Sequence, residues 1–439
     1  MAVVRDNSLG IYISIPFCRS KCTYCNFASG VYPASEHTRY VDRLIQDIEA
    51  AGEWAGEMGV ELARRVDTVY LGGGTPSLLE PKLLARLFAK LRSAFKFDRK
   101  AEITVECAPG QLADETLGAL AAAGVNRVSL GVQSFIDSEA HASGRLHSRA
   151  IVAEDLRRLR AAGLGNVNVD LIAGLAGQTF DSWRESLDVL IESGVPHASV
   201  YMLEVDEDSR LGRELIAGGT RYHAHNVPDE GAIADFYQQA CDTLHAAAIQ
   251  QYEISNFARV GKESRHNLKY WTRQPYLGFG VDAHSMLPAE GRRPSGAEAL
   301  NKNRDADGTA EAGPLPIPSG GRPEIEAVRF STPDSLDGYM NHGTPTVTPV
   351  SKQAALEESL FLGLRLSRGV DLARIRAEFG AERVAGCESV IEKCAEDGLL
   401  EKQGAWVRLT PRGRLLSNDV FVRFLAEDRE VGTSHVNPR

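Results

Sequence analysis

Short apolar runs alternate with longer amphipathic stretches between Ile11 and about Val205. The short runs have the length of buried strands and the stretches between them have helical periodicity, which predicts repeated β-α units and a parallel sheet. We expect strands at 11–15, 66–71, 102–107, 127–132, 167–172 and 198–203, and helices at 37–50, 81–94, 114–123, 149–162 and 180–193. Six units joined by right-handed crossovers predict an α/β fold, either a barrel or an incomplete (β/α)6 barrel.

The pattern changes after this region. A further helix is predicted at 229–249, and residues 288–324 are rich in Gly, Pro, Ala, Arg and Asp without periodicity, which is typical of a loosely packed or disordered insertion. Helices at about 356–364, 372–379 and 384–397 and a strand at 406–409 predict a smaller, mainly helical C-terminal unit that resembles a winged helix. The expected domains are 1–285, an insertion and linker at 286–349, a C-terminal domain at 350–426 and a tail at 427–439.

Composition narrows the classes of function. The 439 residues carry a formal net charge of −10, which argues against nucleic-acid binding, so we interpret the winged unit as a packing or partner domain. No run of about 18 uncharged apolar residues and no secretion signal is present. The seven cysteines do not form a disulfide framework. We therefore expect a cytoplasmic protein.

Three of the cysteines, Cys18, Cys22 and Cys25, fall within eight residues. Three thiolates can hold a cubane iron–sulfur cluster and leave one iron open to another ligand. The alternatives are a structural zinc, which requires a fourth ligand that is missing nearby, and a buried structural trio. Cys387 and Cys394 lie seven positions apart on one predicted helix, a spacing that favours core packing.

Glycines and polar residues end the other predicted strands, where barrels place their active sites. Gly72-Gly73-Gly74-Thr75-Pro76 follows the second strand, and glycines there allow a ligand to approach the backbone, although a tight turn has the same composition. Glu106, Gln133 and Asp170 could bind the hydroxyls and amine of a nucleoside, or could simply be hydrogen-bonded strand ends. Arg145 could pair with a carboxylate.

The C-x3-C-x2-C arrangement of Cys18, Cys22 and Cys25, followed by the Gly-Gly-Thr-Pro loop, resembles the radical S-adenosylmethionine (SAM) superfamily. The resemblance implies a partial barrel, a [4Fe–4S] cluster, an electron donor and bound SAM that is cleaved to a 5′-deoxyadenosyl radical. The SAM-contacting positions that it implies are Tyr12, Gly72, Gly73, Gly74, Thr75, Glu106, Gln133, Arg145 and Asp170. Two positions depart from the usual pattern: Ser14 replaces a histidine and Ala176 replaces a proline.

The chain also resembles the oxygen-independent coproporphyrinogen III oxidases and, more closely, their HemW-type relatives. Phe27 replaces the oxidases' fourth cysteine, only 17 residues precede Cys18, and 266–271 match the His-Asn-x-x-Tyr-Trp motif of HemW proteins. The resemblance implies haem binding, with His266 as the candidate axial ligand and His284 as a weaker one. The alternative for His266 is a structural residue inside the fold.

These observations favour a haem chaperone that delivers haem to client proteins such as respiratory enzymes, with a homodimer as a possible assembly. The competing hypotheses are an oxygen-independent coproporphyrinogen III dehydrogenase and a zinc-binding structural or interaction protein.

Overall fold

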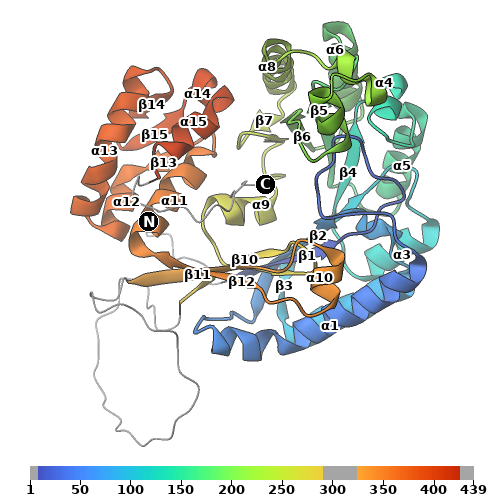
Figure 1. Ribbon diagram of the computed structural model, residues 1–439, viewed down its shortest axis with the longest axis horizontal. Helices are drawn as coiled ribbons and strands as arrows, with labels where there is room; N and C mark the ends of the chain where they lie inside the picture. Colours follow the sequence, from blue (N-terminus) through green and yellow to red (C-terminus); the bar gives the residue numbers. More distant parts are fainter. Residues whose placement is uncertain (1–7, 290–323, 426–439) are drawn as a thin grey trace, which may run out of the picture.

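The computed structural model describes residues 8–289 and 324–425. Most of the predicted insertion at 288–324 and the predicted tail at 427–439 lie outside these residues. The predicted strands are confirmed as six parallel neighbours in chain order, which form an incomplete barrel (Figure 1). They are β1 (Leu9–Ile15), β2 (Arg65–Gly73), β3 (Lys96–Cys107), β4 (Arg127–Gln133), β5 (Val167–Ala173) and β6 (His197–Met202).

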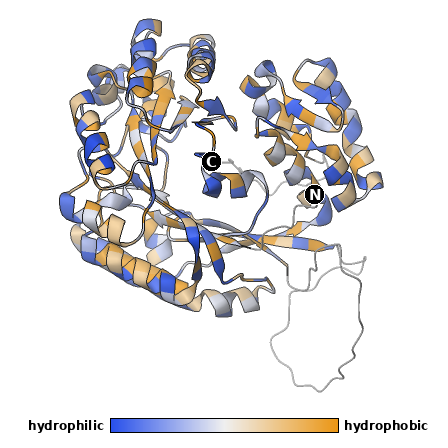
Figure 2. Cartoon of the chain, turned by 180° about the vertical axis from the view of Figure 1, so that it is seen from behind, coloured by the Kyte–Doolittle hydropathy of each residue, from blue (hydrophilic) through white to orange (hydrophobic). Residues whose placement is uncertain are grey.

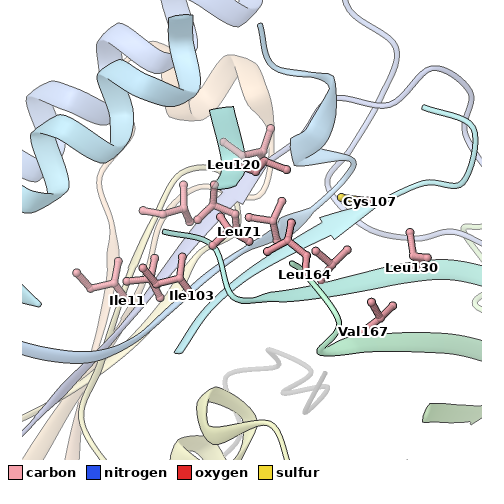
Figure 3. Close-up of a cluster of buried hydrophobic side chains, with 14 of the residues drawn as sticks. Ile11, Leu71, Ile103, Cys107, Leu120, Leu130, Leu164 and Val167 are labelled. Carbon is pink, nitrogen blue, oxygen red and sulfur yellow. The ribbon is translucent and has the colours of Figure 1, made fainter. Parts of the chain in front are cut away.

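Helices cover the outer face of this sheet. They are α1 (Ala34–Glu57), α2 (Pro81–Ala94), α3 (Asp114–Ala122), α5 (Arg149–Ala161) and α6 (Phe180–Glu192). Leu71 and Ile103 of the sheet pack with Leu120 of α3 in the core that Figure 3 shows. The helices turn hydrophilic surfaces to the outside (Figure 2), as their amphipathic sequences predict. The helix boundaries differ most from the prediction in α1, which extends beyond the expected 37–50 at both ends.

The sheet continues past β1 into segments from the second half of the chain. β9 (Tyr276–Phe279) pairs parallel with β1, and β10 (His284–Pro288), β11 (Ile325–Ser331) and β12 (Thr346–Ser351) follow as antiparallel neighbours. The short α10 (Leu336–Met340) joins the last two strands. Backbone pairing therefore makes residues 325–331 and 346–349, which the sequence placed in an insertion and linker, part of the barrel sheet.

At the other edge, β8 (Asn256–Ala258) pairs antiparallel with β6 and with β7 (Gln250–Gln251). The predicted helix at 229–249 is α8 (Glu230–Ala246), and α9 (Arg265–Trp271) follows. Sequence patterns did not reveal four short helices: α4 (Asp137–Ala142), α7 (Arg210–Ile216), η1 (Pro76–Leu78) and η2 (Arg221–Asn226). Figure 1 shows α9 between the barrel strands and the C-terminal unit.

The C-terminal unit has the predicted helices and hairpin. Its helices are α11 (Lys352–Leu364), α12 (Leu372–Phe379), α13 (Ala381–Glu396), α14 (Pro411–Leu415) and α15 (Ser417–Val422), and its strands are β13 (Val370–Asp371), β14 (Leu400–Gln403) and β15 (Trp406–Leu409). Cys387 and Cys394 are buried in its core, as predicted. Across the two described ranges, no helix combines the length and apolarity needed to cross a bilayer.

Candidate functional site

The inner face of the barrel is polar because side chains alternate along each strand. On β3, Ile103 and Val105 belong to the apolar core on the outer face, whereas Glu102, Thr104 and Glu106 occupy the alternate positions. Neighbouring strands repeat this arrangement, and their carboxyl ends meet at one mouth. The cysteine loop, the glycine loop and most of the predicted polar residues lie at this mouth.

The cysteine loop leaves β1 and is held in place by backbone bonds. Cys18 N–H donates to Gly30 O at 2.8 Å, and the hydroxyl of Thr75 lies 3.9 Å from Cys18 Sγ. All three thiols are free, and burial is the main cause of the raised pKa values of Cys18 and Cys25. In the part of the chain that the structure describes, no three His, Cys, Asp or Glu side chains converge at single-ion distance. A cluster site here therefore depends on the donor set and its spacing.

Arg145 lies at the mouth, beside one of the three clustered cysteines. Its Nη1 lies 3.5 Å from Cys22 Sγ and its Nη2 donates to Gly131 O, so the guanidinium lies against a cluster cysteine. Although burial opposes it, the neighbouring Tyr24 and Cys22 raise the pKa of Arg145. The structure therefore places a positive charge directly beside one of the three clustered cysteines.

The glycine loop after β2 packs directly on the chain that enters the cysteine loop. Gly74 N–H donates to Ile15 O at 2.8 Å, and Thr75 N–H donates to Phe17 O at 2.7 Å. A Cβ atom on Gly74 would lie 2.8 Å from both of these carbonyl oxygens, and Gly73 has a φ of 99°, a value that favours glycine. These glycines therefore serve close backbone packing, whatever ligand they also meet.

Glu106 is partly buried at the mouth, and its Oε1 accepts a hydrogen bond from Tyr70 OH at 2.8 Å. Burial raises the pKa of Glu106 to about 7, while the bond from Tyr70 lowers it. The carboxyl group therefore changes its charge near neutral pH. Tyr70 was missed in the sequence because a tyrosine on a predicted strand has no distinguishing signal.

Asp170 and Gln133 complete the mouth on β5 and β4. Asp170 accepts bonds from Ser129 Oγ at 3.0 Å and Asn168 Nδ2 at 2.7 Å, and burial raises its pKa. Gln133 has a φ of 71°, which is uncommon outside glycine, and its buried Oε1 has no hydrogen-bond partner among the described residues. An unpaired buried amide oxygen on a strained backbone is typical of a site that takes a polar ligand.

His266 is buried inside the barrel and is not accessible from the surface. Its side chain is 0% exposed; Nδ1 lies 2.9 Å from Thr68 Oγ1 and Nε2 lies 2.8 Å from Tyr270 OH. Burial lowers its pKa to about 3. Both ring nitrogens are therefore engaged inside the fold, which agrees with the alternative of a structural residue, and the assignment of His266 as an axial ligand stays a prediction. His284 is exposed on β10, 3.5 Å from Asp282.

Comparisons with known proteins agree with this architecture. Residues 12–190 match the family described as the Radical SAM superfamily, and residues 350–416 match the HemN C-terminal domain. The chain is 32% identical to "Heme chaperone HemW" of Bacillus subtilis, covering 95% of this chain and 99% of that protein. It is 28% identical to the bovine mitochondrial "Radical S-adenosyl methionine domain-containing protein 1", covering 96% and 88%. The solved structure of coproporphyrinogen III oxidase (HemN) from Escherichia coli superposes with a TM-score of 0.74 at 22% identity, covering 96% and 91%.

Proposed function

Because the chain belongs to the HemW family of the radical SAM superfamily, we propose that it binds haem and passes it to haem proteins. The observation that carries this proposal is similarity along nearly the whole chain to proteins named heme chaperones, including the barrel and the C-terminal unit. Client enzymes, an electron donor and a homodimer belong to the same proposal. The proposal places the protein in a reducing compartment such as the cytoplasm, where Cys18, Cys22 and Cys25 would stay available as thiolate ligands.

The residues at the mouth fit a [4Fe–4S] cluster and SAM. Cys18, Cys22 and Cys25 would ligate three irons, and Arg145 would stabilise the charge of the ligand set. Gly72, Gly73, Gly74 and Thr75 would border the methionine moiety of SAM, and Tyr12, Glu106, Gln133 and Asp170 would complete its pocket. The unpaired Oε1 of Gln133 supports this fit, because a bound polar group would satisfy it. When bound, the cluster would supply an electron to SAM.

We predict that SAM binding weakens as the pH falls below about 7. Burial raises the pKa of Glu106 to about 7, so acidification removes the negative charge that attracts the ammonium group of SAM. Below that pKa the dissociation constant should rise by up to about tenfold per pH unit. Anaerobic equilibrium dialysis between pH 8 and pH 6 measures this dependence.

The same shift has the opposite consequence for the ligand-free protein. When the pKa of a carboxyl group is higher in the folded than in the unfolded protein, the free energy of unfolding decreases as the pH rises from the unfolded-state pKa toward the folded-state pKa, here about 7. Glu106→Gln should therefore weaken SAM binding at pH 8 without lowering the melting temperature of the free protein. Glu115→Gln, at an exposed position on α3, should leave the pH profile unchanged. An unaltered profile in Glu106→Gln would contradict the assignment.

Haem binding is tested by a Soret titration of the anaerobically reconstituted protein. Reconstitution matters because free Cys18, Cys22 and Cys25 could ligate haem iron themselves. We expect saturable binding, followed by transfer of haem to an apo-haemoprotein. Absence of binding would contradict the chaperone proposal. His266 does not fit an axial ligand in this structure, so the proposal includes no step through it.

A second candidate function is supported by the fold shared with the HemN structure. A coproporphyrinogen III dehydrogenase would convert coproporphyrinogen III to protoporphyrinogen in the presence of SAM and a reductant. We expect no conversion, because Phe27 replaces the additional cysteine of the oxidases. Formation of product in an anaerobic assay would favour the dehydrogenase instead.

A further inference from the structure

The N-terminal part of α9 is anchored to the inner face of the barrel. Carboxylate oxygens of Glu102 accept bonds from the backbone N–H groups of His266 at 3.1 Å and Arg265 at 3.2 Å. Lys269, one turn further on, forms an ion pair with Asp67 at 2.8 Å. These contacts fix the helix against β2 and β3 and place the imidazole of His266 inside the barrel.

The ring of His266 lies against the aromatic side chains that support the mouth. Its centroid is 5.4 Å from that of Tyr70, with an interplanar angle of 30°, and 6.5 Å from that of Tyr12. Tyr12 and Tyr70 are register partners on β1 and β2, and their own rings stack at 6.1 Å. The three rings therefore form one packed group, which we call the aromatic floor.

The aromatic floor connects directly to the acidic group of the mouth, because Tyr70 OH donates to Glu106 Oε1 at 2.8 Å. A Cβ on Gly72 would lie 2.9 Å from both Glu106 Oε1 and Tyr70 Cε1, so the glycine loop also packs on this pair. Movement of the Tyr70 ring would displace the carboxylate and the loop together. His266 and Thr68 lie on the side of Tyr70 away from Glu106, where they limit that movement.

We infer that His266 is a positioning residue of the SAM pocket, which holds Tyr12 and Tyr70 beneath Glu106, and that it is not a ligand of haem iron. The inference rests on the proposed function, since it presupposes that SAM binds at the mouth. An imidazole with both nitrogens hydrogen-bonded must break at least the bond of the ligating nitrogen before it can bind a metal. The contacts of the His266 ring with Tyr70 and Tyr12, in contrast, are present in the structure.

The inference predicts separate effects on the two ligands. His266→Ala leaves a space beneath Tyr70, so the dissociation constant for SAM should rise about tenfold, equivalent to about 1.4 kcal/mol. Tyr70→Phe removes only the hydroxyl bonded to Glu106 and should have a similar effect. Because both changes act through the same pair, the double variant should be little worse than either single variant. Haem affinity from the Soret titration should stay as in the wild type.

A pH profile distinguishes positioning from general loss of structure. The bond from Tyr70 lowers the pKa of Glu106, so loosening Tyr70 should move the midpoint of SAM binding to higher pH. His266→Gln has a side-chain amide that can form a hydrogen bond with Tyr270, so it should recover part of the affinity for SAM. If His266→Ala does not fold, His266→Gln is used in its place. Melting temperatures of the apo proteins identify variants that have lost the fold.

The outcomes are distinct. Unchanged SAM binding in folded His266→Ala or His266→Gln, or additive losses of about a hundredfold in the double variant, would overturn the inference. Loss of haem binding with normal SAM binding would overturn it as well and restore His266 as the ligand. A wild-type protein that binds haem but not SAM would remove the premise and overturn both the SAM part of the proposed function and the inference.

Discussion

Cys22→Ser is expected to abolish assembly of the iron–sulfur cluster, reducing iron from roughly four atoms per chain to near zero after anaerobic reconstitution. Serine is nearly the same size, but its hydroxyl does not ionise near neutral pH and cannot replace a thiolate ligand. Cys22 is also the thiol that lies 3.5 Å from Arg145 Nη1, so the substitution leaves that buried charge without its thiolate partner. Iron and sulfide analysis, together with the visible absorption, measures the loss.

The chain offers a matched control in Cys241→Ser. Cys241 is a free, partly buried cysteine on α8, outside the mouth, and its pKa is raised to about 11 by burial. Its replacement should leave iron content and colour unchanged. Equal iron in wild type and Cys22→Ser, or equal losses in the two variants, would show that the three clustered cysteines are not the cluster site.

The barrel could be predicted because its signals are local. Each of the six parallel strands is a short apolar run closed by glycine or a polar residue, and each following helix has one apolar face. The pairing of β11 with β10 and of β12 with β11 could not be predicted in the same way. The segment that precedes β11 lacks periodicity, and most residues of β12 are exposed, so no burial pattern identifies the strand.

The mouth of the site could be predicted in part, since residue type and strand-end position indicated Glu106, Gln133 and Asp170. Their partners could not be predicted, because they depend on register between strands. Tyr70 reaches Glu106 only because β2 and β3 are adjacent.

The surroundings of His266 could not be predicted from the sequence. The motif contains a histidine, which is a common ligand of haem iron. The role of a histidine also depends on the hydrogen-bond partners of its two ring nitrogens. Thr68 lies 198 positions earlier in the chain, and only the fold brings it to 2.9 Å. The sequence motif therefore located a residue of the barrel interior but did not reveal its contacts with Thr68 and Tyr270.

α9 also connects the aromatic floor to the C-terminal unit. Trp271, on the last turn of α9, packs with Leu362 and Leu366, and Arg365 lies 4.3 Å above its ring. Arg365 is itself 4.0 Å from the buried carboxylate of Glu253. One short helix thus contacts the barrel interior at His266 and the C-terminal unit at Trp271.

Gly74→Ala is expected to lower the free energy of unfolding by about 2–4 kcal/mol and to reduce cluster loading. The new methyl group would lie 2.8 Å from Ile15 O and Phe17 O and 3.0 Å from Phe17 N, and these are backbone atoms that cannot rotate away. To remove these close contacts, the glycine loop must move away from the chain that enters the cysteine loop. That separation breaks the bonds from Gly74 N–H and Thr75 N–H.

Gly118→Ala is the matched control, because Gly118 lies inside α3 with no atom within 4 Å of the new methyl group. There alanine should stabilise the protein by up to about 1 kcal/mol through helix propensity. Urea unfolding of the apo proteins and iron content after reconstitution measure both variants. If Gly74→Ala retained wild-type stability but lost SAM binding, the glycine would be required by the ligand and not by packing. Equal losses of stability and iron would instead show that the two loops form one unit.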